Sequence, residues 1–401
     1  MGHLIVLPVL LREGEGLADK APGVLAQGVV PALHVRGLPG LLAGTSQKSR
    51  TRRDFIKYKI FMGTELFFGI TESGVMHTDA DPQIPLETKF KMVKESGVYD
   101  YFDKTPAKEL EYDYLRCSEK YDLPILAGGW FYVVGRDEEL LMENLRLGGR
   151  LGSLVHNTQI IMDHADGSLV SDEQVAEIYL KAYETGEEIG CRPTFEVHVN
   201  MWSEDFRRIE KVADLVERRG IPFRMTLDHS HVIFKIDNPR EQEVFNIRES
   251  IENGELVLDP FQEDHVCGNW IQRGFVRHCH ARAAVPNNPR NVWKHHPGLE
   301  GLVSQHPKDT IGRGIQYPFL EPEPGQWHSE WNESLLEPWK EVLRQLMRYH
   351  ASHSDSNLKT ISTEFIPNPD YGGGARYSIF ENSLACVRWL RETWNHISTA
   401  V

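Results

Sequence analysis

Short apolar runs alternate with longer amphipathic segments along this chain, from about residue 60 to the C-terminus. The short runs are rich in β-branched and aromatic residues, as strands are, and the longer ones have the apolar spacing of helices. The predicted strands are residues 65–70, 98–102, 125–133, 154–162, 194–200, 223–228, 275–280 and 360–365. The predicted helices are residues 86–96, 106–121, 137–147, 171–190, 205–219, 239–253, 333–350 and 377–394.

This alternation predicts an α/β fold with a parallel sheet. Eight strands, each followed by a helix over about 340 residues, match the count of a (β/α)₈ TIM barrel. A doubly wound sheet is the alternative. The barrel domain is expected to span residues 58–401, with a long loop after strand seven (281–331) that is rich in Pro, Asn, His and Gly. Such a loop would lie over the face where barrel enzymes have their active sites.

Residues 1–57 have a different composition from the rest of the chain. They are rich in Gly, Leu, Val and Pro and show no sustained helical or strand period. A secretory signal is disfavoured because no basic residue precedes the apolar stretch 4–11. We therefore expect a poorly ordered N-terminal extension and assign no function to it.

The amino-acid composition of the chain limits the kinds of partner that it is expected to bind. The chain has 401 residues, with 44 Lys and Arg against 58 Asp and Glu, a net charge of −14 and a pI near 5.7. Nucleic-acid binding, which needs clustered basic surface, is disfavoured. No apolar run has the length of a membrane-spanning helix, so no membrane partner is expected. The cysteines lack a CxxC pair and fit reduced thiols in a cytoplasmic protein; they are Cys117, Cys191, Cys267, Cys279 and Cys386.

Acidic and imidazole side chains occur at the ends of the last four predicted strands. In the strand 194–200, alternation places Glu196, His198 and Asn200 on one face, and the other face is apolar. The outer face of a barrel strand packs on helices, so the polar face should point inward. A structural ion pair is the simpler explanation for Glu196 taken alone, because a buried carboxylate needs a compensating charge.

Three further strand ends favour a metal site over an isolated ion pair. The strands that follow end at Asp228, His280 and Glu364. The carboxyl ends of parallel barrel strands converge on one mouth, where three carboxylates would repel one another unless a divalent cation lay between them. The donor set contains no thiolate, so we expect one divalent cation, Mn²⁺ in first place, with Mg²⁺, Co²⁺ and Zn²⁺ as alternatives.

Two histidines near these strand ends need separate assignments. His278 and His280 share a face, and His280 lies nearer the carboxyl end, so it is the predicted ligand, with His278 one layer below. His231, three residues past Asp228, is predicted to lie near the substrate, with a surface loop position as the alternative.

Other polar and aromatic residues near the strand ends are candidate substrate contacts. Trp130 and Trp202 could each present a flat apolar face to a bound substrate or could equally be core aromatics. His156, Asn157 and Gln159 are polar where a barrel strand should be apolar, so we expect one or two of them to contact substrate.

The series FEVHVN, LDHSH, RHCHAR and STEF resembles the strand-end motifs of the xylose isomerase-like TIM barrels. That family includes ketose 3-epimerases, hydroxypyruvate isomerases, inosose dehydratases and, more remotely, abasic-site endonucleases. The resemblance covers about residues 61–394 and implies Glu196, Asp228, His280 and Glu364 as metal ligands and His231 as a neighbour of the substrate. Arg282 lies only two residues after His280, which departs from many epimerases, and we assign it to the substrate contacts.

The predicted function is a metal-dependent sugar isomerase or epimerase. A cation chelated by a keto or hydroxy sugar would stabilise an enediolate, while Glu196 and Glu364 remove and return a proton, with His231 as a further catalytic candidate. A keto-sugar lyase or dehydratase on the same site is the alternative. An abasic-site endonuclease and a non-catalytic sugar-binding barrel are less favoured. The sequence leaves open the sugar, its phosphorylation and the formation of a homo-oligomer.

Overall fold

The computed structural model describes residues 65–78, 82–287, 314–327, 329–367 and 376–400. The predicted N-terminal extension, 1–57, and much of the predicted loop 281–331 lie outside the described residues. Within them, no helix combines the length and the apolarity needed to cross a membrane. The five cysteines are buried and form no disulfide.

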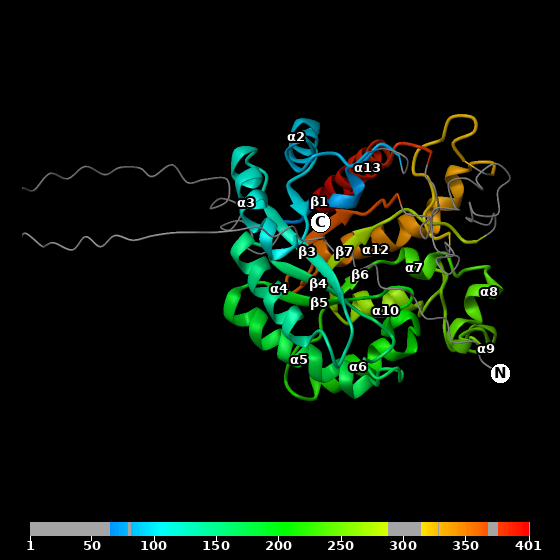
Figure 1. Ribbon diagram of the computed structural model, residues 1–401. Helices are drawn as coiled ribbons and strands as arrows, with labels where there is room; N and C mark the ends of the chain where they lie inside the picture. The colour runs from blue at the N-terminus through cyan, green and yellow to red at the C-terminus, as the bar shows by residue number, and fades with distance from the viewer. Residues whose placement is uncertain (1–64, 79–81, 288–313, 328, 368–375, 401) are drawn as a thin grey trace, which may run out of the picture.

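The strands form one closed parallel barrel in sequence order, which confirms the predicted (β/α)₈ fold (Figure 1). β8 pairs with β1 through Phe67↔Thr360 and closes the ring. The strands are β1 (Phe67–Thr71), β2 (Tyr101–Asp103), β3 (Ile125–Tyr132), β4 (Val155–Ile160), β5 (Arg192–Glu196), β6 (Met225–Leu227), β7 (Val276–Ala281) and β8 (Thr360–Thr363).

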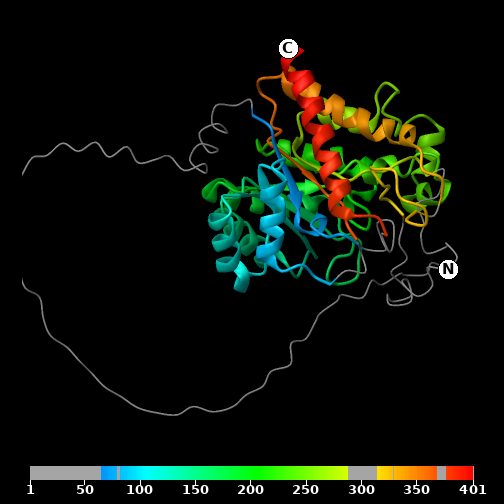
Figure 2. The same ribbon diagram turned by 90° about the horizontal axis from the view of Figure 1, so that it is seen from above.

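Helices surround the barrel, and α13 lies beside β1 and α12 (Figure 2). α5 begins at a capping box in which Ser171 and Gln174 each bond the other's backbone, and it ends at Gly190 with φ 75°. The main helices are α2 (Leu86–Ser96), α3 (Glu111–Lys120), α4 (Glu138–Leu151), α5 (Asp172–Ile189), α6 (Arg207–Glu217), α10 (Val266–Gln272), α12 (Glu337–Ser352) and α13 (Ile379–Ala400).

The core has an outer and an inner part. Outward-facing strand residues pack against the helices, and a smaller inner cluster includes Phe67, Tyr101 and Val155. Gly69 of β1 makes room for the Tyr101 ring, because a Cβ at position 69 would lie 2.3 Å from that ring. The inner cluster fills one end of the barrel and leaves the carboxyl ends of the strands for polar side chains.

The structure differs from the predicted elements at β5, at the helix 239–253 and at the helix α10 (Val266–Gln272). β5 stops at Glu196 and Asn200 adopts φ 63°, so His198 and Asn200 do not continue the strand as predicted. The single predicted helix 239–253 is two short helices, α8 (Pro239–Gln242) and α9 (Arg248–Glu252), separated by Phe245 at φ 61°. The helix α10 was not predicted; it is short and follows a segment rich in acidic and turn residues.

The loops after β7 and β8 are joined above the carboxyl ends of the strands. Tyr317 N donates to Ala283 O at 2.8 Å. Gln316 donates to Ile366 O and accepts from Ile366 N, at 3.2 and 2.7 Å. The described parts of the loop after β7 therefore pack against the mouth where the predicted site lies.

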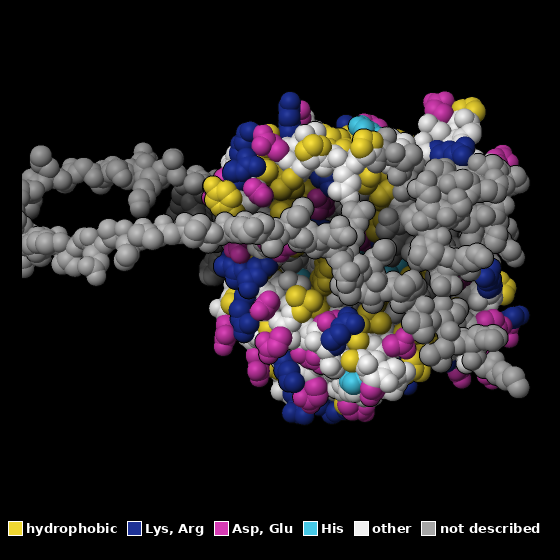
Figure 3. Space-filling model, in the orientation of Figure 1, with side chains coloured by type: hydrophobic (Ala, Val, Ile, Leu, Met, Phe, Trp, Pro, Cys, Tyr) yellow, Lys and Arg dark blue, Asp and Glu magenta, His cyan; other side chains and the backbone are white. Residues whose placement is uncertain are grey.

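Acidic and basic side chains are interspersed on the face of the molecule drawn in Figure 3. Many of them form exposed pairs, such as Arg150 with Glu111 at 2.7 Å. Such pairs contribute little to stability, so the charges that matter for function are the buried ones.

Candidate metal centre

The predicted strand-end residues lie together at the carboxyl mouth of the barrel. Glu196 is the last residue of β5, Asp228 follows β6, His280 lies in β7 and Glu364 follows β8. One ligand atom from each lies within 4.8 Å of the others, and all four side chains are buried. Four separate strands thus present oxygen and imidazole donors to one point.

Glu196 is held by neighbours on both sides. Its Oε2 accepts from Asn157 Nδ2 at 2.7 Å and from Gln159 Nε2 at 2.5 Å, and its Oε1 lies 2.9 Å from His280 Nδ1. Burial alone would raise the pKa of Glu196, but the charge and hydrogen bond of His280 outweigh it and lower that pKa to about 2. Glu196 is therefore an ionised carboxylate with a fixed orientation.

Arg282 joins two of the other carboxylates. Its Nη1 lies 2.8 Å from Asp228 Oδ2, and its Nη2 lies 2.6 Å from Glu364 Oε2. The guanidinium is fully buried and also donates through Nε to the Glu364 carbonyl at 3.2 Å. Burial would raise the pKa of Asp228, but Arg282 and then His231 lower it well below its usual range. Arg282 is thus part of the charge balance of the site.

His231 is fully buried beside Asp228. It therefore lies near the site, as predicted, and not in a surface loop. Its Nε2 lies 3.1 Å from both Asp228 Oδ2 and Arg282 Nη1. Its ring also packs against His198 with centroids 4.1 Å apart. His231 lies at the start of the short helix α7 (Ser230–Ile233), which places it directly behind the Asp228 carboxylate.

The charges of the site favour a cation. Burial would lower the pKa of His280, yet Glu364 and Glu196 raise it well above its ordinary value. Even with His280 protonated, three carboxylates face that imidazolium and the Arg282 guanidinium, and Asp103 adds a further carboxylate on the other side of His280, so negative charge is in excess. Oxygen-rich donors within 4.8 Å of one another and a surplus negative charge fit a hard or borderline divalent ion.

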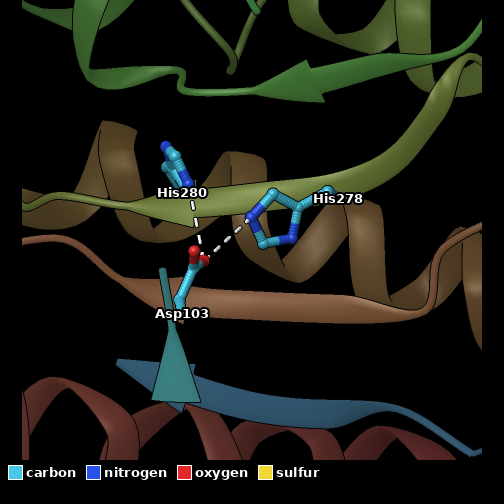
Figure 4. A group of neighbouring side chains, drawn as sticks. All are labelled: Asp103, His278 and His280. Atoms are coloured by element: carbon cyan, nitrogen blue, oxygen red, sulfur yellow. Dashed lines mark ion pairs between the residues drawn. The ribbon is translucent and has the colours of Figure 1, made fainter. Parts of the chain in front are cut away.

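A second layer lies beneath His280 and centres on Asp103, the last residue of β2 (Figure 4). Asp103 Oδ2 lies 3.4 Å from His278 Nε2 and 3.8 Å from His280 Nε2. Ser362 Oγ donates to the same Asp103 oxygen at 2.5 Å. His278 Nδ1 lies 2.8 Å from Thr360 Oγ1. His278 is therefore one layer below His280, as predicted, and Asp103 faces the Nε2 side of both rings.

Sequence reasoning missed Asp103 because the second predicted strand stopped at Phe102. The signal was present, since Asp103 follows an aromatic strand and has the same inward parity as Tyr101. Extending the strand by one residue would have placed a fifth acidic or imidazole strand end at this mouth.

Three of the expected substrate contacts lie elsewhere. His156 faces outward, where its Nε2 and Nδ1 lie 2.6 Å from Tyr132 Oη and 3.2 Å from Thr105 Oγ1. Trp202 is buried in the large hydrophobic core cluster. Trp130 lines a cavity of about 490 Å³ between α4 and the loop before α3. Of the β4 residues, only Asn157 and Gln159 reach Glu196, because they alternate with His156 along the strand.

Comparison with known proteins gives structural neighbours only. No protein-family model matches the sequence, and no curated protein matches it. A D-psicose 3-epimerase from Clostridium cellulolyticum H10, solved with D-tagatose, is 10% identical; the match covers 82% of this chain and 99% of that chain, with a TM-score of 0.47. The 3-keto-D-glucoside 4-epimerase YcjR from E. coli is 12% identical, with coverage of 82% and 100% and a TM-score of 0.44.

A third solved structure is a xylose isomerase domain protein from Planctomyces limnophilus. It is 9% identical, with coverage of 83% and 99% and a TM-score of 0.46. Two of these neighbours are described as sugar epimerases and the third as a xylose isomerase domain protein. The barrel itself is established by strand order and register, and function has to be inferred from the side chains of the site.

Proposed function

We propose that this chain is a divalent-metal-dependent sugar isomerase or epimerase that transfers a proton through an enediolate. One observation carries the proposal: donor atoms of Glu196, Asp228, His280 and Glu364 converge within 4.8 Å in a buried site. Its position at the carboxyl mouth of a TIM barrel is where enzymes of this fold have their catalytic groups.

Glu196, Asp228, His280 and Glu364 would hold the cation, with Mn²⁺ proposed first because the donors are mainly oxygen. When bound, the cation would supply a Lewis acid that polarises a substrate carbonyl. His280 would offer Nδ1, the nitrogen that faces Glu196 and Glu364, since its Nε2 faces Asp103.

Glu364 and Glu196 are the proposed proton-transfer pair. Glu196 ends β5 and Glu364 follows β8, three strands further around the closed barrel, so the two carboxylates would approach a bound substrate from different strands. Glu364 has the partly exposed side chain of the two, at 10% against 0% for Glu196. We assign proton abstraction to Glu364, which becomes protonated. Glu196 would take up a second proton, derived from solvent, and deliver it to the other face of the enediolate, and Glu364 would then lose its proton to solvent.

The remaining polar residues have supporting roles in this proposal. Asn157 and Gln159 fix the Glu196 carboxylate through their amide groups, and we assign them to positioning rather than to direct substrate contact. Arg282 would stabilise negative charge that develops on substrate oxygen, because its guanidinium already lies between two strand ends. His231 orients Asp228 and is the alternative proton carrier.

The test is proton NMR of a panel of keto sugars incubated in D₂O with the protein and Mn²⁺. Exchange at one carbon, with formation of an epimer or an aldose, is the expected result, and it should be lost in Glu364→Gln. A new alkene signal would indicate elimination. Absence of exchange with every sugar, in a protein shown by elemental analysis to hold one metal ion, would contradict the proposed reaction.

A further inference from the structure

The four strands that end in the proposed metal ligands begin with basic residues. Arg192 is the first residue of β5, Arg224 precedes β6, Arg277 is the second residue of β7, and Lys359 precedes β8. Because the strands are parallel and paired in sequence order, these residues lie at one mouth of the barrel, opposite the candidate metal centre.

Backbone pairing and electrostatics place these side chains near one another. Lys359 N donates to Arg277 O at 3.0 Å. The pairing of β6 with β7 shifts register at Arg277, which is an extra residue between Val276 and His278. The positive charge of Arg277 is repelled by the charges of Arg192 and Arg224, and the positive charge of Lys359 is repelled by that of Arg277. The basic residues therefore form one cluster, which we call the amino-end cluster.

The amino-end cluster has fewer carboxylates than cations: Glu187 acts on Arg192 and Arg277, and Glu217, which is also paired with Arg273, acts on Arg224. Among the described residues, only Arg192 of the four forms an ion pair, with Glu187 at 2.6 Å. Arg224 Nη1 donates to the Phe223 carbonyl at 2.7 Å. Arg277 Nε is buried and has no hydrogen-bond partner in the described part of the chain. Burial and then repulsion from its arginine neighbours lower the pKa of Arg277 to about 10.

A buried guanidinium N–H without a partner, such as Arg277 Nε, is costly, and repulsion from neighbouring cations adds to that cost. The chain has 58 acidic residues against 44 basic ones, so carboxylates are plentiful elsewhere on it. Converging arginines with free N–H groups are the usual means of binding phosphate-like anions, because the guanidinium presents several donors in one plane.

We propose that the amino-end cluster binds a small oxyanion with more than one negative charge, either inorganic phosphate or the phosphate group of a small molecule. Arg277 Nε would supply a buried donor, and Arg192, Arg224 and Lys359 would supply the surrounding positive charge. An anion bound there would link the beginnings of β5 to β8 and stabilise the barrel by mass action. The site is separate from the candidate metal centre and does not depend on the proposed sugar chemistry.

Isothermal titration calorimetry of the full chain with inorganic phosphate, at constant ionic strength set with NaCl, tests this proposal. Arg277→Gln should weaken phosphate binding by at least about 10-fold, since it removes a charge-assisted buried donor. Lys359→Gln should weaken it by about 3-fold, because Lys359 is partly exposed. The matched control is Arg136→Gln, an exposed arginine paired with Asp137 beyond β3, which should leave binding unchanged.

Further variants locate the bound phosphate. Asp228→Asn, at the other mouth, should retain phosphate binding. Loss of phosphate binding in this variant would mean that phosphate binds at the metal centre and would overturn the proposal. Unchanged binding in both Arg277→Gln and Lys359→Gln would also overturn it, as would the absence of any phosphate heat in the parent protein. If circular dichroism shows that Arg277→Gln does not fold, the phosphate affinity of Lys359→Gln decides whether the proposal stands. A parallel titration with a sugar monophosphate identifies the source: tighter binding than phosphate indicates a phosphorylated small molecule, and equal binding indicates the free ion.

Discussion

Each mouth of the barrel contains an arginine on or just after β7, fully buried in the case of Arg282 and half-buried in the case of Arg277, and the two side chains have opposite surroundings. At the carboxyl mouth, Arg282 lies 2.8 Å from Asp228 and 2.6 Å from Glu364. At the amino mouth, Arg277 has arginine and lysine neighbours and an unpartnered Nε. The comparison shows that the same four strands separate charge along their length, with surplus negative charge at one end and surplus positive charge at the other.

The largest expected effect tests the acidic mouth. Glu364→Gln keeps the size and one coordinating oxygen but removes the basic site, so turnover should fall by about 10²–10⁴-fold while bound metal is reduced but detectable. Asp228→Asn should act mainly through lost metal, so added Mn²⁺ should restore part of its activity and hardly any of the activity of Glu364→Gln. Steady-state rates over a range of Mn²⁺ concentrations measure this. An identical response of both variants would reassign proton transfer to His231 or to Glu196 alone.

The next effect compares the two arginines directly. Arg282→Met leaves Asp228 and Glu364 without their guanidinium partner, so the free energy of unfolding of the metal-free protein should fall by about 3–5 kcal/mol. Arg277→Met removes a half-buried charge whose buried Nε has no partner among the described residues, and without phosphate it should leave stability unchanged or raise it. Urea denaturation in EDTA measures both variants. Equal destabilisation would mean that Arg277 has compensating partners and that the two mouths do not differ as described.

A smaller effect concerns the layer beneath the acidic mouth. A carboxylate that faces the second nitrogen of a metal-binding histidine orients its ring, and loss of such a partner typically costs about 10–100-fold in metal affinity. Asp103→Asn should therefore weaken Mn²⁺ binding in calorimetry by that factor. Glu111→Gln, an exposed carboxylate paired with Arg150, is the control. Unchanged affinity in Asp103→Asn would show that Ser362 and the β7 backbone suffice to position His280.

The smallest effect separates the two faces of β4. Burial lowers the pKa of His156 from 6.5 to about 3, so the unfolded chain binds a proton below pH 6.5 that the folded chain does not. The stability contributed by neutral His156 is present above pH 6.5 and is lost as pH falls towards 3, at about 1.4 kcal/mol per pH unit. His156→Gln should remove that slope between pH 6 and about pH 4 in denaturation curves. An unaltered slope would place the proton uptake on other buried histidines.

The sequence by itself determined the barrel and the membership of the candidate metal centre. Hydrophobic alternation located all eight strands, and parallel strands in a closed barrel must bring their carboxyl ends to one mouth. Glu196, Asp228, His280 and Glu364 could therefore be grouped without coordinates, since each lies at or next to the end of its own strand. His156 was grouped with Asn157 and Gln159 as a candidate contact, although alternation along β4 places it on the opposite face.

Only the tertiary structure decided which neighbours compensate those charges. The path of the loop after β7 decides whether Arg282 lies between Asp228 and Glu364. Asp103 faces His278 because of where β2 ends and how β2 lies across the barrel from β7. Arg277 joins the amino-end cluster through a register shift between β6 and β7. Strand patterns are local and are encoded within a few residues, whereas loop paths, register shifts and contacts across the barrel result from the packing of the whole chain.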